Sequence, residues 1–304
     1  MNILLIAGGW STEREVSLAG AASVATALES LGHHVDLFDL SPNFNELLLA
    51  ASAHDFAFIN LHGSPGEDGL VQALLDSIHC PYQGSGPAPS FLALNKAAAK
   101  QIFRFNKLPT ADWDFLQSMP PKEWEPSPKW PFFVKSNTGG SSLRLGKVAD
   151  RQELQTYLEE IFNAGESALL EPAIKGRDLT CGILGCQALP PVLIEPLAGE
   201  FFDYKSKYAN GGAREICPAP LPPELILQVQ ELALQAHTLL GLQGYSRVDF
   251  LLDDNNRLFI LEANTLPGMT STSLLPQEAK AIGMDFPDLL ETLIKLGQQD
   301  HPRK

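Results

Sequence analysis

The first hundred residues alternate short apolar runs with segments of helical periodicity. Residues 3–7 are an apolar run that ends at Gly8 and Gly9, which is typical of a buried parallel strand. Thr12 and Glu15 have the spacing of a capping box and predict the start of a helix. Further strands are predicted at residues 34–40 and 56–60, and further helices at 68–77 and 89–105. This alternation predicts an α/β domain with a parallel sheet.

The pattern changes after residue 108. Residues 119–128 are rich in proline and predict a connection on the surface. Beyond them, strands are predicted at residues 132–135, 168–171 and 179–184, and helices at 151–164 and 223–240. We therefore expect an N-terminal α/β domain followed by central and C-terminal α+β domains, with boundaries at residues 1–95, 96–180 and 181–304.

Residues 246–252 and 257–264 alternate in a way that predicts a β-hairpin. A turn centred between Asp254 and Asn255 would pair Arg247 with Glu262 across the two strands, and Asp249 with Ile260. One face would then be wholly apolar, formed by Val248, Phe250, Leu252, Phe259, Leu261 and Ala263. The other face would carry Arg247, Asp249, Glu262 and Asn264, mixed with Leu251, Leu258 and Ile260.

The polar face of this hairpin has two interpretations. Two carboxylates and an amide oxygen on adjacent strands are hard ligands that suit Mg²⁺. Alternatively, Arg247 and Glu262 form a cross-strand ion pair and Asp249 lies at the surface. The hairpin alone leaves both interpretations open.

Residues 137–142 are a Gly- and Ser-rich loop after the strand predicted at 132–135. Small residues let backbone N–H groups approach an anion closely, and Lys135 and Lys96 are candidates to add positive charge. The loop lacks the Gly-Lys-Ser/Thr of a Walker A motif, and the chain lacks a complete Gly-x-Gly-x-x-Gly fingerprint after its first strand. Taken alone, such a loop is more often a plain turn.

Composition narrows the class of protein further. A formal net charge of −14 argues against non-specific binding of nucleic acid, which depends on clustered Lys and Arg. The four cysteines form no CxxC pair, and Cys181 and Cys186 are expected to be buried thiols. The N-terminus has no basic region of a signal peptide, and no apolar run is long enough to span a membrane. We therefore expect a cytoplasmic protein with no membrane partner.

Taken together, these motifs resemble the D-alanine–D-alanine ligases of the ATP-grasp superfamily. The resemblance extends from residue 8 to about residue 296, with the motifs in the order and at the spacing of the family. The matching stretches are residues 8–18, 61–69 and 81–86, Asn95 with Lys96, the loop at 140–142, and residues 202–208, 247–249 and 261–274.

The resemblance implies ATP and D-alanine as substrates, two Mg²⁺ or Mn²⁺ ions, and a homodimer. It implies that the ATP phosphates contact Lys96, Lys135, Ser141 and Ser142. Around the adenine and ribose it implies Glu171, Pro172, Ala173 and Asp178, the last at a position where the family usually has Glu. The implied metal ligands are Asp249, Glu262 and Asn264.

The same resemblance implies roles around the amino-acid substrates. Glu13 would hold the ammonium of the first D-alanine, with His62 close by. Arg247 and the backbone N–H of Gly268 would stabilise the oxyanion. The carboxylate of the second D-alanine would be received by Ser273 and Leu274, under a closing loop that carries Lys207 and Tyr208.

Two departures and two rival functions accompany the resemblance. Ser136 stands where the family commonly has proline, and Leu143-Arg144-Leu145 replaces its usual valine-glycine pattern. A ligase that makes D-alanyl-D-lactate or D-alanyl-D-serine is the nearest rival, and relatives that prefer lactate tend to lack a tyrosine at the position of Tyr208. The other rival is a nucleotide-binding regulatory protein without turnover. The joint presence of the acidic and basic site residues argues against it.

Overall fold

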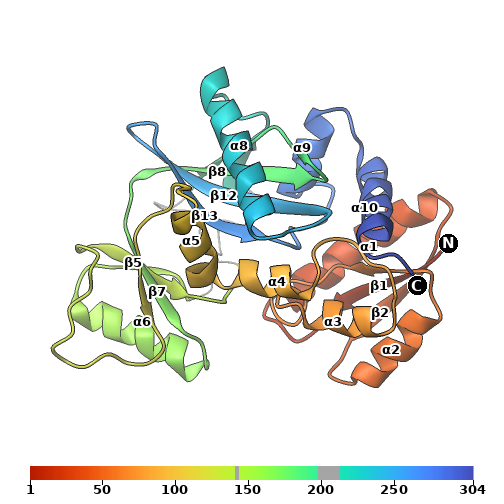
Figure 1. Cartoon of the computed structure of the whole chain (residues 1–304), viewed down its shortest axis with the longest axis horizontal. Helices are drawn as coiled ribbons and strands as arrows, with labels where there is room; N and C mark the ends of the chain where they lie inside the picture. Colours follow the sequence, from red (N-terminus) through yellow and green to blue (C-terminus); the bar gives the residue numbers. More distant parts are fainter. Residues whose placement is uncertain (141–143, 198–211, 304) are drawn as a thin grey trace.

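The computed structural model describes residues 1–140, 144–197 and 212–303, which contain three sheets with helices packed on them (Figure 1). The first sheet is parallel, in the order β2-β1-β3. Its strands are β1 (Asn2–Gly8), β2 (His34–Leu40) and β3 (Phe56–Ile59), and the accompanying helices are α1 (Arg14–Ser30), α2 (Phe44–Ser52) and α3 (Leu70–Ser77). The parallel α/β unit predicted from the sequence is therefore confirmed.

Two details of the helix predictions in this region were wrong. The predicted capping box does not form. Helix α1 begins at Arg14, its N-cap residue is Glu13, and no side chain makes a capping hydrogen bond. The single helix expected at residues 89–105 is two helices, α4 (Pro87–Leu94) and α5 (Lys96–Phe105). Asn95 separates them in an extended conformation, and its side chain accepts a hydrogen bond from the Ala98 N–H as the N-cap of α5.

The second sheet is antiparallel, in the order β4-β7-β5-β6. Its strands are β4 (Asp114–Leu116), β5 (Phe132–Ser136), β6 (Gly146–Val148) and β7 (Ala168–Pro172), and α6 (Arg151–Asn163) packs on it. Asp150 caps α6 by accepting from the N–H groups of Gln152 and Glu153.

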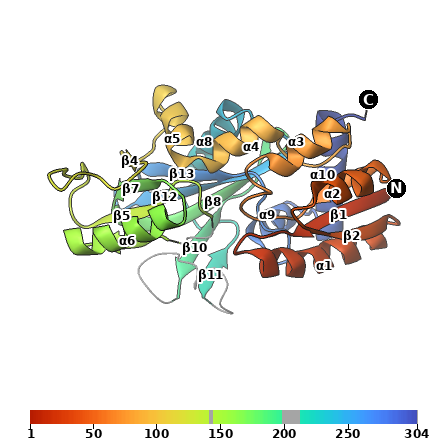
Figure 2. The ribbon, with the colours of Figure 1, turned by 90° about the horizontal axis from the view of Figure 1, so that it is seen from below.

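The third sheet is antiparallel and has the main order β11-β10-β8-β12-β13. Its strands are β8 (Gly176–Leu184), β9 (Gln187–Ala188), β10 (Val192–Pro196), β11 (Ala213–Ile216), β12 (Tyr245–Asp253) and β13 (Leu258–Asn264). Figure 2 shows α4, α5 and α8 (Pro223–Leu239) on one side of this sheet. Phe103 of α5 and Ala233 of α8 belong to the same apolar core as Phe250 of β12.

The last two helices are α9 (Leu274–Ala281), which packs on β8, and α10 (Phe286–Asp300), which returns to the first sheet. Leu293 and Ile294 of α10 share an apolar core with Ile3 and Leu5 of β1, and the two chain ends lie near each other (Figure 1). The domain boundaries expected at residues 1–95, 96–180 and 181–304 stay predictions.

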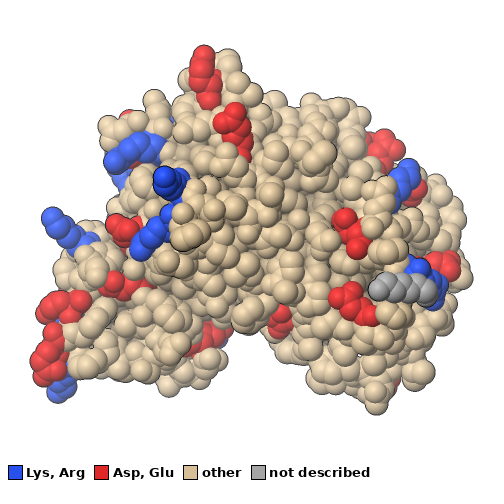
Figure 3. All heavy atoms as spheres, in the orientation of Figure 1, with Lys and Arg blue, Asp and Glu red and all other residues tan. Residues whose placement is uncertain are grey.

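Three further observations concern the surface charge, the lengths of the apolar helices and the cysteines. On the face drawn in Figure 3, acidic and basic side chains lie mainly toward the edges, and the broad middle carries few charges. Among the described residues, no helix has both the length and the apolar character needed to cross a membrane. Cys181 is buried as expected, but Cys186 is exposed, because it lies in the turn between β8 and β9.

Candidate active site

The hairpin of β12 and β13 forms, but the predicted register was wrong. Arg247 lies opposite Asn264, and Asp249 lies opposite Glu262. The turn is longer than expected because Asn256 adopts a left-handed conformation and Asp253 accepts hydrogen bonds from the Asn255 and Arg257 N–H groups. The register then shifts once more between residues 249 and 250.

This register also changes which residues face the core. The buried face comprises Val248, Phe250, Leu252, Leu258, Ile260 and Ala263. Leu258 and Ile260 had been expected on the polar face, whereas Phe259 and Leu261 had been expected in the core and are only half-buried. The irregularity in the ladder places Leu261 and Glu262 consecutively at half-buried positions. The polar residues of both strands nevertheless meet, as the hairpin pattern predicted.

Asp249 is the centre of a hydrogen-bond network on this half-buried face. It accepts two hydrogen bonds from Arg247, both of 2.8 Å, one from Asn264 Nδ2 at 3.0 Å and one from Thr180 Oγ1 at 2.7 Å. The alternative in which Arg247 pairs with Glu262 and Asp249 lies at the surface is therefore wrong. Burial alone would lower the pKa of Arg247, but the nearby carboxylates, Asp249 first, raise that pKa above its usual value.

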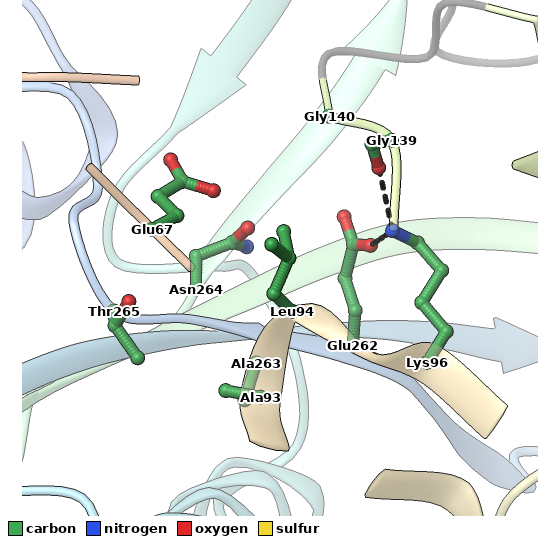
Figure 4. A pocket seen from close by; sticks show the side chains of 10 residues that line it. All are labelled: Glu67, Ala93, Leu94, Lys96, Gly139, Gly140, Glu262, Ala263, Asn264 and Thr265. Carbon is green, nitrogen blue, oxygen red and sulfur yellow. Dashed lines mark hydrogen bonds and ion pairs between the residues drawn. The ribbon is translucent and has the colours of Figure 1, made fainter. Parts of the chain in front are cut away.

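Lys96 connects Glu262 to the Gly-rich loop. Its Nζ donates to the Gly139 carbonyl oxygen at 2.7 Å and lies 3.1 Å from Glu262 Oε2 (Figure 4). The same loop holds the start of α5, because Asn137 accepts hydrogen bonds from the Lys96 and Ala97 N–H groups. The break between α4 and α5 thus places Lys96 beside the loop and the strand β13.

A cavity of about 600 Å³ lies between the second and third sheets. Its lining includes these residues expected from the family resemblance: Lys96, Lys135, Glu171, Pro172, Ala173, Asp178, Arg247, Asp249, Glu262 and Leu274. Apolar side chains that the sequence analysis did not assign to a site also line it, among them Phe133, Ile174, Ile194, Leu251 and Leu261. Leu251 on the predicted polar face of the hairpin was a sequence signal for this partly apolar wall, whereas Leu261 had been predicted in the core.

Glu171 lies buried between two lysines. Lys100 Nζ is 2.5 Å from Glu171 Oε1, and Lys135 pairs with the other carboxylate oxygen. Burial alone would raise the pKa of Glu171, but Lys135 and Lys100 together lower it to about 2. The sequence analysis missed Lys100, although it follows Lys96 by four residues and therefore shares a face of the same helix.

Buried Glu13 and half-buried His62 and Glu67 lie at the N-terminal side of the site. Glu13 is 6% exposed, and a methyl group added at Gly140 would lie only 3.0 Å from its Oε2 atom. His62 Nδ1 is 3.9 Å from Glu67 Oε1. Burial lowers the pKa of His62, whereas burial and Glu13 raise the pKa of Glu67 to about 8. Glu67 lies within the recognised stretch 61–69 but was not singled out.

Gly268 and Ser273 lie together just before α9. Ser273 Oγ accepts a hydrogen bond from the Thr270 N–H at 3.0 Å, and a methyl group added at Gly268 would lie 3.1 Å from it. Leu274 is the first residue of α9 and lines the large cavity. Four other expected site residues lie outside the described residues: Ser141, Ser142, Lys207 and Tyr208.

Known proteins resemble this chain over its whole length. Residues 94–295 match the family model described as D-ala D-ala ligase C-terminus. The D-alanine–D-alanine ligase of Desulfovibrio desulfuricans is 62% identical over 304 residues, covering 100% of this chain and 99% of the relative. That of Nitratidesulfovibrio vulgaris strain DP4 is 61% identical and covers 98% of each chain.

Solved structures agree with these sequence matches. The D-alanine–D-alanine ligase from Bacillus anthracis complexed with ATP has a TM-score of 0.88 and 33% identity, covering 99% of this chain and 98% of the other. The ligase from Coxiella burnetii has a TM-score of 0.84 and 25% identity, covering 99% and 94%. With a fold of the ATP-grasp type and full-length similarity to these enzymes, the chain belongs to the D-alanine–D-alanine ligase family.

Proposed function

We propose that this protein is an ATP-dependent ligase that joins two D-alanine molecules into D-alanyl-D-alanine for peptidoglycan synthesis. The observation that carries the proposal is the meeting of Asp249, Glu262 and Asn264 beside Arg247. Asp249, Glu262 and Arg247 line a cavity of about 600 Å³. Lysines from other elements reach the same cavity, so it offers a place for a nucleotide with a charged phosphate tail. The full-length similarity to D-alanine–D-alanine ligases supports the same reaction.

The donor set fits a divalent cation, because carboxylate and amide oxygens are the ligands that Mg²⁺ prefers. Both carboxylates already interact with cations: Asp249 accepts a hydrogen bond from Arg247, and Glu262 forms an ion pair with Lys96. We propose that these two residues and Asn264 hold two Mg²⁺ or Mn²⁺ ions, which would offset the charge of the phosphates. Among the described residues no three His, Cys, Asp or Glu side chains cluster as metal ligands, so phosphate oxygens would complete the coordination.

In the first half-reaction, the carboxylate of one D-alanine attacks the γ-phosphorus of ATP. An oxygen–phosphorus bond forms, the bond to the ADP oxygen breaks, and an acyl phosphate results. Lys96 and Lys135, with Ser141 and Ser142 outside the described residues, would hold the phosphates. Glu171, Pro172, Ala173 and Asp178 would surround the adenine and ribose. Glu13 would bind the ammonium of this first D-alanine, with His62 beside it.

In the second half-reaction, the amine of the other D-alanine attacks the acyl carbon. A carbon–nitrogen bond forms, phosphate leaves, and the amine loses a proton. Arg247 and the Gly268 N–H would stabilise the oxyanion, and such donors contribute roughly 3–4 kcal/mol each. Ser273 and Leu274 would receive the second carboxylate. We assign the closing loop with Lys207 and Tyr208 from the family resemblance alone, because it lies outside the described residues.

The proposal is tested by product identity. Purified protein with ATP and Mg²⁺ is given D-alanine, D-serine and D-lactate, singly and in pairs, and phosphate release and product mass are measured. We expect D-alanyl-D-alanine with one phosphate released per dipeptide. The Asp249→Asn variant is expected to lose on the order of 100-fold or more in rate, because a ligand for the cation is removed.

The matched control is Asp254→Asn, which removes an exposed carboxylate at the tip of the same hairpin and is expected to keep the wild-type rate. ATP binding without phosphate release that depends on D-alanine would favour a regulatory protein. A preference for D-lactate or D-serine over D-alanine as the second substrate would favour the rival ligases. A homodimer and a cytoplasmic location are proposed from the family resemblance and stay predictions.

A further inference from the structure

Lys100 is a buried cation that the reaction described above does not use. Its side chain has no exposed surface, although it is a lysine of the amphipathic helix α5. Burial lowers the pKa of Lys100, and Glu171 opposes that shift. A lysine is almost never fully buried unless it is paired, so its partners are expected to explain its presence.

Two partners hold the Lys100 ammonium. It lies 2.5 Å from Glu171 Oε1 and donates to Thr110 Oγ1 at 2.6 Å. The Thr110 hydroxyl in turn donates to the carbonyl oxygen of Ile260 at 2.9 Å, two residues before Glu262 on β13. Lys100 therefore connects α5 to β7 and, through Thr110, to β13, two strands of different sheets whose residues line the large cavity.

The buried group of Lys100, Lys135 and Glu171 carries a net charge. Glu171 carries one negative charge and is shared by two lysines, Lys100 and Lys135, so the three side chains together carry one positive charge. Lys135 and Glu171 line the cavity. Without Lys100, the negative charge of Glu171 would cancel the positive charge of Lys135. The remaining pair would then present no net charge to a bound phosphate.

We propose that Lys100 is a positioning residue for ATP: by sharing Glu171, it fixes the carboxylate and leaves the positive charge of Lys135 for the nucleotide phosphates. This inference rests on the proposed function in one respect, namely that ATP phosphates bind beside Lys135. Lys100 itself touches no substrate and acts through Glu171.

The test compares nucleotide affinities. Lys100→Met removes the charge and keeps an unbranched side chain that is one atom shorter. We expect the Kd for Mg²⁺–ADP, measured by calorimetry, to rise about 10-fold. The KM for ATP should rise similarly, while kcat and the KM values for D-alanine change by less than about 2-fold, because only nucleotide binding is affected. The matched control is Arg104→Met, which removes an exposed cation of the same helix and should leave the Kd unchanged.

A double variant separates charge from packing. Lys100→Met combined with Glu171→Gln restores the net charge of one, so its Kd should be at least about 3-fold lower than that of Lys100→Met alone. Additive losses in the double variant, or a wild-type Kd in Lys100→Met, would overturn the inference. If the wild-type protein itself bound no nucleotide, the proposed function would fail instead, so the two failures are distinguishable.

Discussion

At the scale of single residues, the site uses cations to hold its carboxylates in place. Arg247 donates hydrogen bonds to Asp249, Lys96 forms an ion pair with Glu262, and two lysines form ion pairs with Glu171. Buried carboxylates without such partners would be costly, because burial disfavours the charged form. The residue types of this site were predictable from its motifs. The partner of each was not, since the Arg247–Glu262 ion pair considered as one of two alternatives does not form, and Arg247 pairs with Asp249 instead.

His237 provides a test of buried charge away from the site. It is 5% exposed on α8, its Nδ1 lies 2.7 Å from Ser246 Oγ on β12, and burial lowers its pKa to about 4. The unfolded chain binds the proton near pH 6.5, so between pH 6.5 and 4 the unfolded state holds more protons than the folded state. Stability should therefore fall by about 3 kcal/mol as the pH drops through this window.

We expect the His237→Gln variant to lose less free energy of unfolding than wild type between pH 6.5 and pH 4, as measured by urea denaturation. The exposed His34→Gln variant serves as the control and should keep the wild-type dependence on pH. Equal pH dependence in wild type and His237→Gln would show that this histidine does not titrate differently on folding.

At the scale of elements, periodicity predicted most strands and helices but not how they end or pair. The helix expected at residues 89–105 breaks because Asn137, some 40 residues away, accepts hydrogen bonds from the first N–H groups of α5. The hairpin register differs because Asn256 takes a left-handed conformation in the turn. The helix break and the hairpin register each depend on one or two hydrogen bonds or dihedral angles. The pattern of hydrophobic residues does not predict such local interactions.

Helix α9 packs on β8 at Gly182, where the absence of a side chain leaves room for the carboxyl group of Glu278. Gly182 lies opposite Arg247, and a methyl group added there would lie 2.3 Å from both Glu278 Oε2 and Leu275 Cδ1. Glu278 is fully buried, and burial raises its pKa well above the usual value. Gly182→Ala should therefore destabilise the protein by about 1–3 kcal/mol through overpacking.

Adding Glu278→Ala to Gly182→Ala should recover part of that loss, because one of the two clashing groups is removed. The free energies of unfolding of both single variants and the double variant form a double-mutant cycle that measures this coupling. Strictly additive effects would mean that the two side chains do not compete for the same space.

At the scale of the whole molecule, the end of the chain completes the core of its beginning. Leu289, Leu290, Leu293 and Ile294 of α10 belong to the same apolar cluster as the strands of the first sheet. That sheet has three strands within the described residues, and its core includes these side chains from the other end of the chain. The N-terminal α/β unit is therefore expected to depend on α10 for its stability.

Leu293→Ala tests that dependence, because Leu293 is fully buried against the first sheet. We expect a loss of about 2–5 kcal/mol in unfolding free energy and faster amide hydrogen exchange in β1 and β3. Leu227→Ala, at a leucine that is 59% exposed on α8, is the control and should change the stability little. An effect on exchange confined to α10 would contradict the shared core.

The sequence by itself determined the α/β and α+β classes of the elements, the family and the residue types of the site. These follow from local periodicity and from motifs that are contiguous along the chain. Only the tertiary structure decided that Asp249 faces Glu262, that Lys100 lies behind Glu171, and that α10 covers the first sheet. The physical reason is that packing, burial and the pairing of charges depend on residues far apart in the chain, whose proximity exists only after folding.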